Sequence, residues 1–165
     1  MKHQYGFTLL ELLIVIALMV IILAITIPSM TQAKINANEV SAVASVRAIG
    51  QAEVSYQAAY GGYAESLANL GGAEPCTKSA ATACLLDQSL AGGVKSGYNF
   101  AAVGSNVANG MSTSYVTGAA PVVFERTGKR MFCSTDKNVI RADLNAAGST
   151  TPPDAQRCAG FKALE

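Results

Sequence analysis

One charged side chain stands inside an otherwise apolar stretch near the start of the chain. Phe7–Ile27 reads FTLLELLIVIALMVIILAITI and contains a single ionisable residue, Glu11. As a helix this stretch would span roughly 31 Å, close to the ~30 Å hydrocarbon core of a bilayer. A carboxylate in such surroundings costs roughly 2.5–3.5 kcal/mol at the membrane centre, and less near an end. The chemistry expected of Glu11 is therefore pairing with a cation.

The cysteines are a second group with chemical potential, at Cys76, Cys84, Cys133 and Cys158. No CxxC pair occurs and the only histidine is His3, so the usual ligand set of a zinc site is missing. An even count behind an export-type segment favours two disulfides formed in an oxidising compartment. Three connectivities are possible, and we favour the pairing of sequence neighbours, 76 with 84 and 133 with 158. Free buried thiols are the alternative.

Catalytic chemistry finds little support in the residue types. Because His3 lies in the polar N-terminal segment MKHQYG, no Ser–His or Cys–His nucleophile pair is expected in the rest of the chain. P-loop and GxGxxG motifs are also absent. Asp136, Asn138 and Asp143 offer oxygen ligands for calcium, but their turn-forming tendency explains them better. We expect no enzymatic activity, no cofactor and no metal.

A group of basic residues lies in the second half of the chain: Arg126, Lys129, Arg130, Lys137 and Arg141. Such a patch can bind nucleic acid or a charged surface. Acidic residues are interspersed among them, and the whole chain has 12 Lys and Arg against 11 Asp and Glu. A solvated hairpin is therefore the favoured interpretation, and no specific nucleic-acid partner is predicted.

A single long helix is expected to position Glu11. The apolar stretch leads directly into Lys34–Tyr60, where residues recur at spacings of three, four and seven on one stripe: Ile35, Ala42, Val46, Ile49, Tyr56 and Tyr60. Pro28 lacks a backbone donor and should kink this helix. The Gly pair at 61–62 is expected to end it, at a length of roughly 80 Å.

The two acidic residues of the amphipathic half have different expected positions. Glu39 is expected elsewhere on the helix surface, whereas Glu53 falls on the apolar stripe and weakens the prediction of an uninterrupted core face. Tyr56, Tyr60 and Tyr63, at the end of the helix, are expected to belong to the core.

The remainder of the chain predicts a small antiparallel sheet packed on the striped face, an α+β architecture. Residues 61–95 form a loop-rich connector with Gly-Gly pairs, and short helical turns are expected at 65–70 and 83–90. Aromatic and β-branched residues between turn residues then predict strands, at 97–103, 113–117, 129–134 and 138–142. The tail 145–165 is polar.

The N-terminal end suggests an orientation across a membrane. Lys2 and the initiator amine add positive charge before the apolar run, so the amino end is expected to stay cytoplasmic and the remainder to be exported. An ordinary secretory signal cleaved near 30–33 is the competing interpretation. Glu11 and an apolar run longer than the usual ~7–15 residues argue against it.

The run Gly6-Phe7-Thr8-Leu9-Leu10-Glu11, followed by a long apolar helix, resembles the type IV prepilin signature. This signature is shared by type IV pilins and by the pseudopilins of type II secretion. It combines a short basic leader ending in Gly with Phe next, Thr after it, and Glu at the fifth residue beyond the junction. The rest of the chain matches the family in architecture alone, as a type IV pilin-like α+β fold whose long helix has a transmembrane first half.

The resemblance implies roles for particular residues and divides the chain into three parts. Gly6 would end a leader (1–6) removed by prepilin peptidase, and Phe7 would become an N-methylated amino terminus. Glu11 would compensate that new positive charge on a neighbouring subunit during assembly, and Pro28 matches a helix-kinking proline. Residues 7–33 would then be the transmembrane and polymerisation helix, and 34–165 the amphipathic helix with the exported head.

The function implied is that of a structural pilus subunit, which would support adhesion, motility or DNA uptake. Its partners would be copies of itself and other pilins, the peptidase, the inner-membrane assembly machinery, and lipid before assembly. It would be a single-pass inner-membrane protein and then part of an extracellular pilus. A periplasmic pseudopilus is the first alternative, because the signature is shared. A monomeric single-pass anchor with a periplasmic binding domain is the second.

Overall fold

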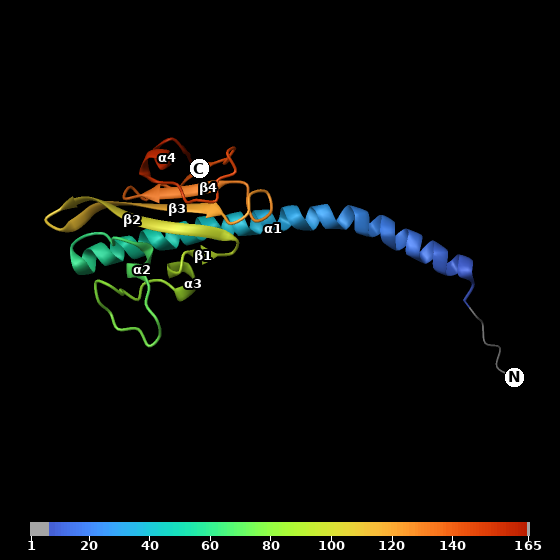
Figure 1. Cartoon of the computed structure of the whole chain (residues 1–165), viewed down its shortest axis with the longest axis horizontal. Coiled ribbons are helices and arrows are strands. Elements are labelled where there is room, and N and C mark those ends of the chain that lie inside the picture. The colour runs from blue at the N-terminus through green and yellow to red at the C-terminus, as the bar shows by residue number, and fades with distance from the viewer. Residues whose placement is uncertain (1–6, 165) are drawn as a thin grey trace. The chain divides into compact units, whose positions relative to one another are not determined.

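The structure is a computed structural model that describes residues 7–164, except for the side chains of 25–29. Its chain divides into two compact units, Met1–Lys34 and Ile35–Glu165, here called the N-terminal unit and the head. Helix α1 (Leu9–Tyr60) runs through the boundary between them (Figure 1). Each unit is described by itself below.

The head holds the remaining elements, which are three short helices and six strands. The helices are α2 (Leu67–Leu70), α3 (Gln88–Ala91) and α4 (Ala155–Ala159). The strands are β1 (Val94–Lys95), β2 (Tyr98–Ala108), β3 (Met111–Pro121), β4 (Met131–Thr135), β5 (Arg141–Asp143) and β6 (Lys162–Ala163). All pairings are antiparallel and the strand order follows the sequence, β1-β2-β3-β4-β5-β6. The expected α+β class with a small antiparallel sheet is confirmed.

The striped face of α1 packs on the sheet as expected. Buried α1 residues share one apolar cluster with side chains of β2, β3 and β4: Ala42, Val46, Ile49, Ala52 and Tyr56 with Phe100, Ala102, Ala119 and Phe132. Tyr60 packs against the same cluster while remaining half-buried. The period-3.6 spacing of small and β-branched residues thus builds the first layer of the head.

A second, smaller core covers the opposite face of the sheet. Side chains alternate between the two faces of a strand, so on β4 Phe132 joins the α1 cluster while Met131 and Cys133 join the second one. The C-terminal segment completes this second cluster through Cys158 and Phe161. The polar tail expected from the sequence therefore forms a packed layer.

The strand predictions differ from the structure mainly at the edges. The segments 97–103, 113–117 and 129–134 lie largely within β2, β3 and β4, whereas 138–142 overlaps β5 only at its end. β2 continues to Ala108 and meets β3 through Asn109 and Gly110, which both have positive φ, the backbone of a tight hairpin turn. β1 and β6 are two residues each, too short to leave an alternating pattern.

Two expectations about the first half of α1 have different outcomes. Among residues 7–164, no helix combines the length and the apolar composition that crossing a membrane requires. The transmembrane assignment of 7–33 is therefore not confirmed. The helix itself continues through Pro28, and the kink expected there stays a prediction.

Candidate assembly site

The first turn of α1 is capped by one side chain of the N-terminal unit, that of Thr8. Helix α1 begins at Leu9, and the preceding Thr8 accepts a hydrogen bond through Oγ1 from the backbone amide of Glu11 at 3.2 Å. Thr8 therefore acts as the N-cap, which satisfies one of the amides that have no partner within the helix. The sequence carried this signal as Thr followed three residues later by Glu, a spacing typical of helix starts.

Glu11 lies in that first turn with its side chain exposed. Neither ion pair among the described residues, Lys95–Asp87 or Arg130–Glu39, involves it. Its carboxylate stands near the positive end of the helix dipole, which stabilises an anion modestly. Among the described residues, Glu11 is therefore stabilised by the helix N-terminus and by no ion pair with a side chain.

The surface around Glu11 is apolar on every side of the helix. Phe7 is 76% exposed, and the large apolar side chains that follow are also exposed: Leu9, Leu10, Leu12, Leu13, Ile14, Val15, Ile16, Leu18, Met19, Val20, Ile21, Ile22 and Leu23. An apolar surface of this extent on a protein marks an interaction site or a membrane contact. The N-terminal unit therefore presents a surface suited to burial by lipid or by another protein.

Not every residue of the predicted site can be placed. Gly6, the expected last leader residue, lies outside the described residues. Phe7 is described and precedes the helix, so its backbone is not part of α1. For Pro28 only the helical backbone is described. The structure thus places Glu11 in the first turn of α1, with Thr8 as its cap and Phe7 directly before the cap.

The four cysteines form two disulfides in the head. Cys76 bonds Cys84 and closes the connector loop, and Cys133 bonds Cys158, which ties α4 to β4. This is the pairing of sequence neighbours that was favoured among the three connectivities. No free cysteine is present.

The basic group of the second half is partly used inside the head. Arg130 Nε donates to Glu39 Oε2 at 2.7 Å, and the guanidinium also lies over the ring of Phe132. Arg141 donates to the backbone carbonyl of Phe161 at 3.1 Å. Two of the five cations therefore make contacts within the head, and the interpretation of the group as a solvated hairpin stays a prediction.

Glu39 is buried, so the prediction from the sequence that it lies on the helix surface is wrong. Its side chain is buried, and Oε1 accepts hydrogen bonds from the backbone amides of Lys129 at 2.9 Å and Arg130 at 3.1 Å. A buried carboxylate is tolerated when ionised partners and amides surround it. The helical period placed Glu39 off the stripe, and only the β3–β4 loop, 90 residues later, covers it.

Glu53 is the second buried acid, and it has fewer partners. Oε2 accepts from the backbone amide of Ala64 at 2.9 Å, whereas Oε1 has no hydrogen-bond partner. Burial raises the pKa of the carboxyl from 4.5 to about 7, and the hydrogen bond from Ala64 lowers it by less. Its negative charge in turn contributes to raising the pKa values of Tyr56 and Tyr115.

Calcium ligation by the acidic turn residues finds no geometric support. Within residues 7–164, no three His, Cys, Asp or Glu side chains are arranged to hold a metal ion. Asn138 instead has a positive φ and accepts a hydrogen bond from the hydroxyl of Tyr115 at 3.2 Å. Its role is that of a turn residue packed against β3.

Comparison with known families adds one match, confined to the start of the chain. Residues 1–27 match the model of the prokaryotic N-terminal methylation motif. The chain carries the prepilin signature of type IV pilins and pseudopilins. No curated protein and no solved structure matches the chain. The prepilin signature thus covers Glu11 in the first turn of α1 and the two residues before that helix, Phe7 and Thr8.

Proposed function

We propose that this chain is a structural subunit of a type IV pilus. It is made as a membrane-anchored precursor, loses residues 1–6 to prepilin peptidase, and polymerises through its N-terminal helix. The observation that carries the proposal is the methylation motif over residues 1–27. Its role is structural and not catalytic.

The apolar surface of the N-terminal unit supports polymerisation. Full burial of one Leu, Ile or Val side chain contributes about 1.5–3 kcal/mol, and more than ten such side chains are exposed between Phe7 and Leu23. A bilayer can cover them before assembly, and the same surfaces of neighbouring copies can cover them afterwards.

The position of Glu11 supports an intermolecular ion pair. Cleavage after Gly6 would create an ammonium group at Phe7, four residues before Glu11 and next to the start of α1. In apolar surroundings an ammonium and a carboxylate each need a partner. Because no described cation pairs with Glu11, a neighbouring subunit's new amino terminus is the proposed partner. Such a pair would set the axial register between subunits.

A pilus is favoured over a type II secretion pseudopilus on the character of the head. The head is substantial, with a six-stranded sheet covered on both faces, and its two disulfides are compatible with the periplasm and with the cell exterior. Adhesion, motility or DNA uptake would follow from the filament. The prepilin signature is common to both assemblies, so the filament itself has to be identified.

Intact mass spectrometry of the protein from its native host tests the proposal. The expected mass lacks residues 1–6, includes one added methyl group, and is four hydrogens lighter because of the two disulfides. An uncleaved chain contradicts the proposal and favours a monomeric anchored protein. Electron microscopy of sheared surface filaments, labelled with an antibody to the head, then separates a pilus from a periplasmic pseudopilus.

A further inference from the structure

The head carries an open pocket at the end of α1 that the proposed function does not use. It has a volume of about 380 Å³ and is lined by Tyr56, Tyr60, Gly62, Tyr63, Glu65, Asn69, Ala80, Ala81, Gly110, Met111 and Ser112. Four segments meet there: the end of α1, the link to α2, the disulfide loop, and the β2–β3 turn. We call it the tyrosine pocket.

Several contacts hold the walls of the tyrosine pocket in place. The hydroxyl of Tyr56 donates to the carbonyl of Ala80 at 2.7 Å, which fastens the disulfide loop to α1. The rings of Tyr56 and Tyr60 lie 4.7 Å apart between centroids. The amide of Tyr63 donates to the carbonyl of Ser112 at 2.9 Å, which joins the link after α1 to β3. The pocket is therefore a built feature and not a gap between mobile loops.

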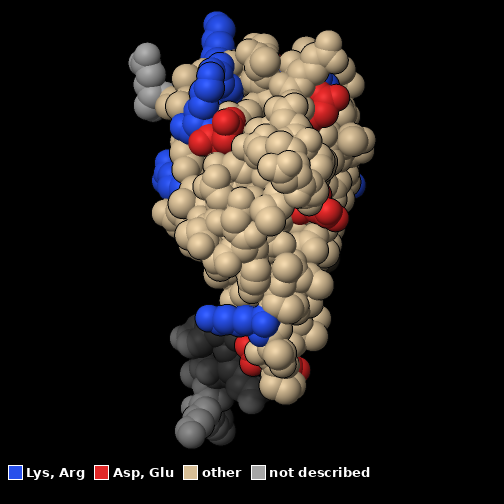
Figure 2. Space-filling model, turned by 90° about the vertical axis from the view of Figure 1, so that its left-hand side faces the viewer, with Lys and Arg blue, Asp and Glu red and all other residues tan. Residues whose placement is uncertain are grey.

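The chemistry of the lining suits a cation. Three tyrosines belong to the lining, with Tyr60 and Tyr63 half-buried, and an ammonium or guanidinium over the accessible face of a tyrosine ring is attracted to it. Glu65 adds an exposed carboxylate at the rim, and no Lys or Arg belongs to the lining. Glu53 is buried close by, bonded to the amide of Ala64. In Figure 2, which faces the end of the head that carries the β2–β3 turn, much of the surface is uncharged.

A free cation lies at the opposite end of the same head. The β3–β4 loop is fixed beside the start of the head's helix, where Asn38 donates to the carbonyl of Thr127 at 2.9 Å. Arg126 in this loop is exposed, and neither ion pair among the described residues uses it. Glu125 beside it weakens the local positive charge, and Lys129 adds to it. About 22 residues of helix separate Asn38 from Tyr60, roughly 33 Å.

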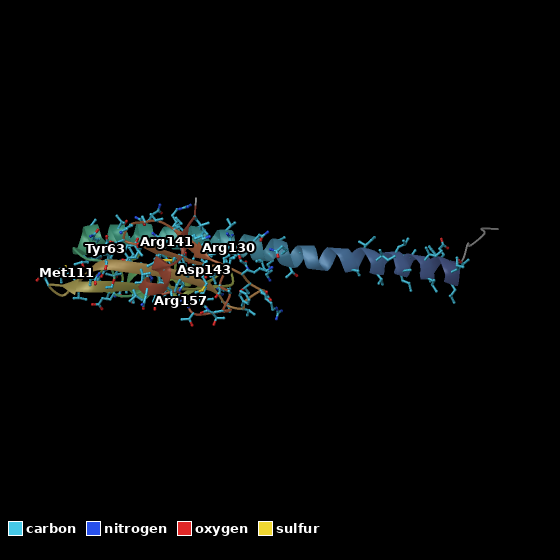
Figure 3. All side chains as sticks on the ribbon, turned by 90° about the horizontal axis from the view of Figure 1, so that it is seen from above. Tyr63, Met111, Arg130, Arg141, Asp143 and Arg157 are labelled. Atoms are coloured by element: carbon cyan, nitrogen blue, oxygen red, sulfur yellow. A yellow bond between two sulfur atoms is a disulfide. The ribbon has the colours of Figure 1, made fainter. Side chains whose placement is uncertain are left out.

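Figure 3 shows residues near the two ends of the head. Tyr63 and Met111 lie toward one end of the head in Figure 3, and Arg130, which follows the β3–β4 loop, lies toward the other. A cation at one end and a cation-binding pocket at the other cannot meet within one head. They can meet between two copies stacked head to tail, and a contact between different surfaces of identical subunits propagates into a filament when it does not close into a ring.

We propose that the tyrosine pocket of one head receives the Arg126 guanidinium of a second copy, with Glu65 as its ion-pair partner. This inference rests on the proposed function, since it supplies a head-to-head contact along the filament. Arg suits the site because its planar group can stack on a tyrosine ring while it donates to a carboxylate.

A cross-linking experiment in the full chain tests the contact. Glu65→Cys and Arg126→Cys are combined, expressed with the assembly machinery, and treated with a short bismaleimide. The double variant should give a ladder of covalent oligomers, whereas each single variant should give none beyond a dimer. Filaments without a ladder overturn the inference and leave the proposed function standing. A ladder without filaments supports the contact between heads and contradicts the proposed pilus function. If neither a ladder nor filaments form, the contact and the pilus function are both contradicted.

Charge reversal checks that the attraction is electrostatic. Glu65→Arg and Arg126→Glu should each lose filament incorporation at low salt, and the two reversals should restore it when they are combined in one chain. Asp136→Arg and Lys162→Glu, exposed positions outside the pocket and the loop, are the matched controls and should assemble like wild type. A combined variant no better than its single parents overturns the ion pair.

Discussion

The hydroxyl oxygen of Thr8 accepts a hydrogen bond from the backbone amide of Glu11, so two residues of the prepilin signature are joined by the cap of α1. The signature therefore has a local structural role besides processing. It starts the helix immediately after the expected cleavage site and places the Glu11 carboxylate in the first turn. A helix that begins there brings Phe7 and Glu11 to the same end of the apolar surface.

Loss of the cap should loosen the first turn. Thr8→Ala is expected to destabilise it by about 1 kcal/mol, because the Glu11 amide loses its acceptor. Amide hydrogen exchange of Glu11, measured on the full chain in detergent micelles, should become roughly fivefold faster, in line with that free-energy change. Thr8→Ser keeps the hydroxyl oxygen and should exchange like wild type. Equal protection in Thr8→Ala would show that the cap contributes nothing.

Replacement of Glu11 should affect assembly more than insertion. Glu11→Ala removes a carboxylate from an apolar surface, so association with membranes should persist or improve. Incorporation into filaments should fall, because the cationic terminus of a neighbouring Phe7 loses its partner. The two quantities are read from membrane fractionation and from the sheared filament fraction, with Asp136→Ala as an exposed acid control. If Glu11→Ala gave the wild-type yield of filaments, Glu11 would have no role in assembly beyond its place in the first turn of α1.

The ion pair between buried Glu39 and partly exposed Arg130 should be sensitive to removal of the carboxylate. Glu39→Ala leaves the amides of Lys129 and Arg130 and the Arg130 side chain without their acceptor. A loss of about 2–4 kcal/mol in the free energy of unfolding is expected. Glu39→Gln keeps one oxygen acceptor and should lose less. Urea unfolding of the oxidised protein measures both, and an Ala variant as stable as wild type would refute the role of Glu39.

Glu53 should make the stability of the head depend on pH. Its pKa is about 7 in the folded chain and near the ordinary 4.5 in the unfolded one. Between these values the folded chain holds a proton that the unfolded chain has lost. The free energy of unfolding should therefore fall as pH rises from 4.5 to 7, by about 3 kcal/mol in total.

A non-ionisable side chain at the same position isolates this effect. Glu53→Gln should flatten the decline, and its melting temperature relative to wild type should rise between pH 5 and pH 8. The melting temperatures are followed by circular dichroism. Parallel pH profiles of wild type and Glu53→Gln would contradict a titrating Glu53.

Much of the head could be predicted because its signals are periodic and local. The stripe from Ile35 to Tyr56 marked the buried face of α1, and turn residues bounded the central strands. The two-residue strands β1 and β6 gave no such signal. They form because they pair with neighbouring strands. Two residues are too few to show a strand pattern in their own composition.

The sequence by itself determined the assembly end of this protein. The Gly-Phe-Thr-Leu-Leu-Glu run, the Thr-to-Glu spacing and the unbroken apolar stretch all depend on residues within a few turns of one another, so their meaning survives without the rest of the fold. Only the tertiary structure decided which charged and aromatic residues of the head are buried and which contacts they make. Glu39 is buried because Arg130 reaches it, and the tyrosine pocket exists because the disulfide loop and the β2–β3 turn close around the end of α1. Contacts between segments so far apart in the chain depend on how the whole head packs, and no local pattern encodes them.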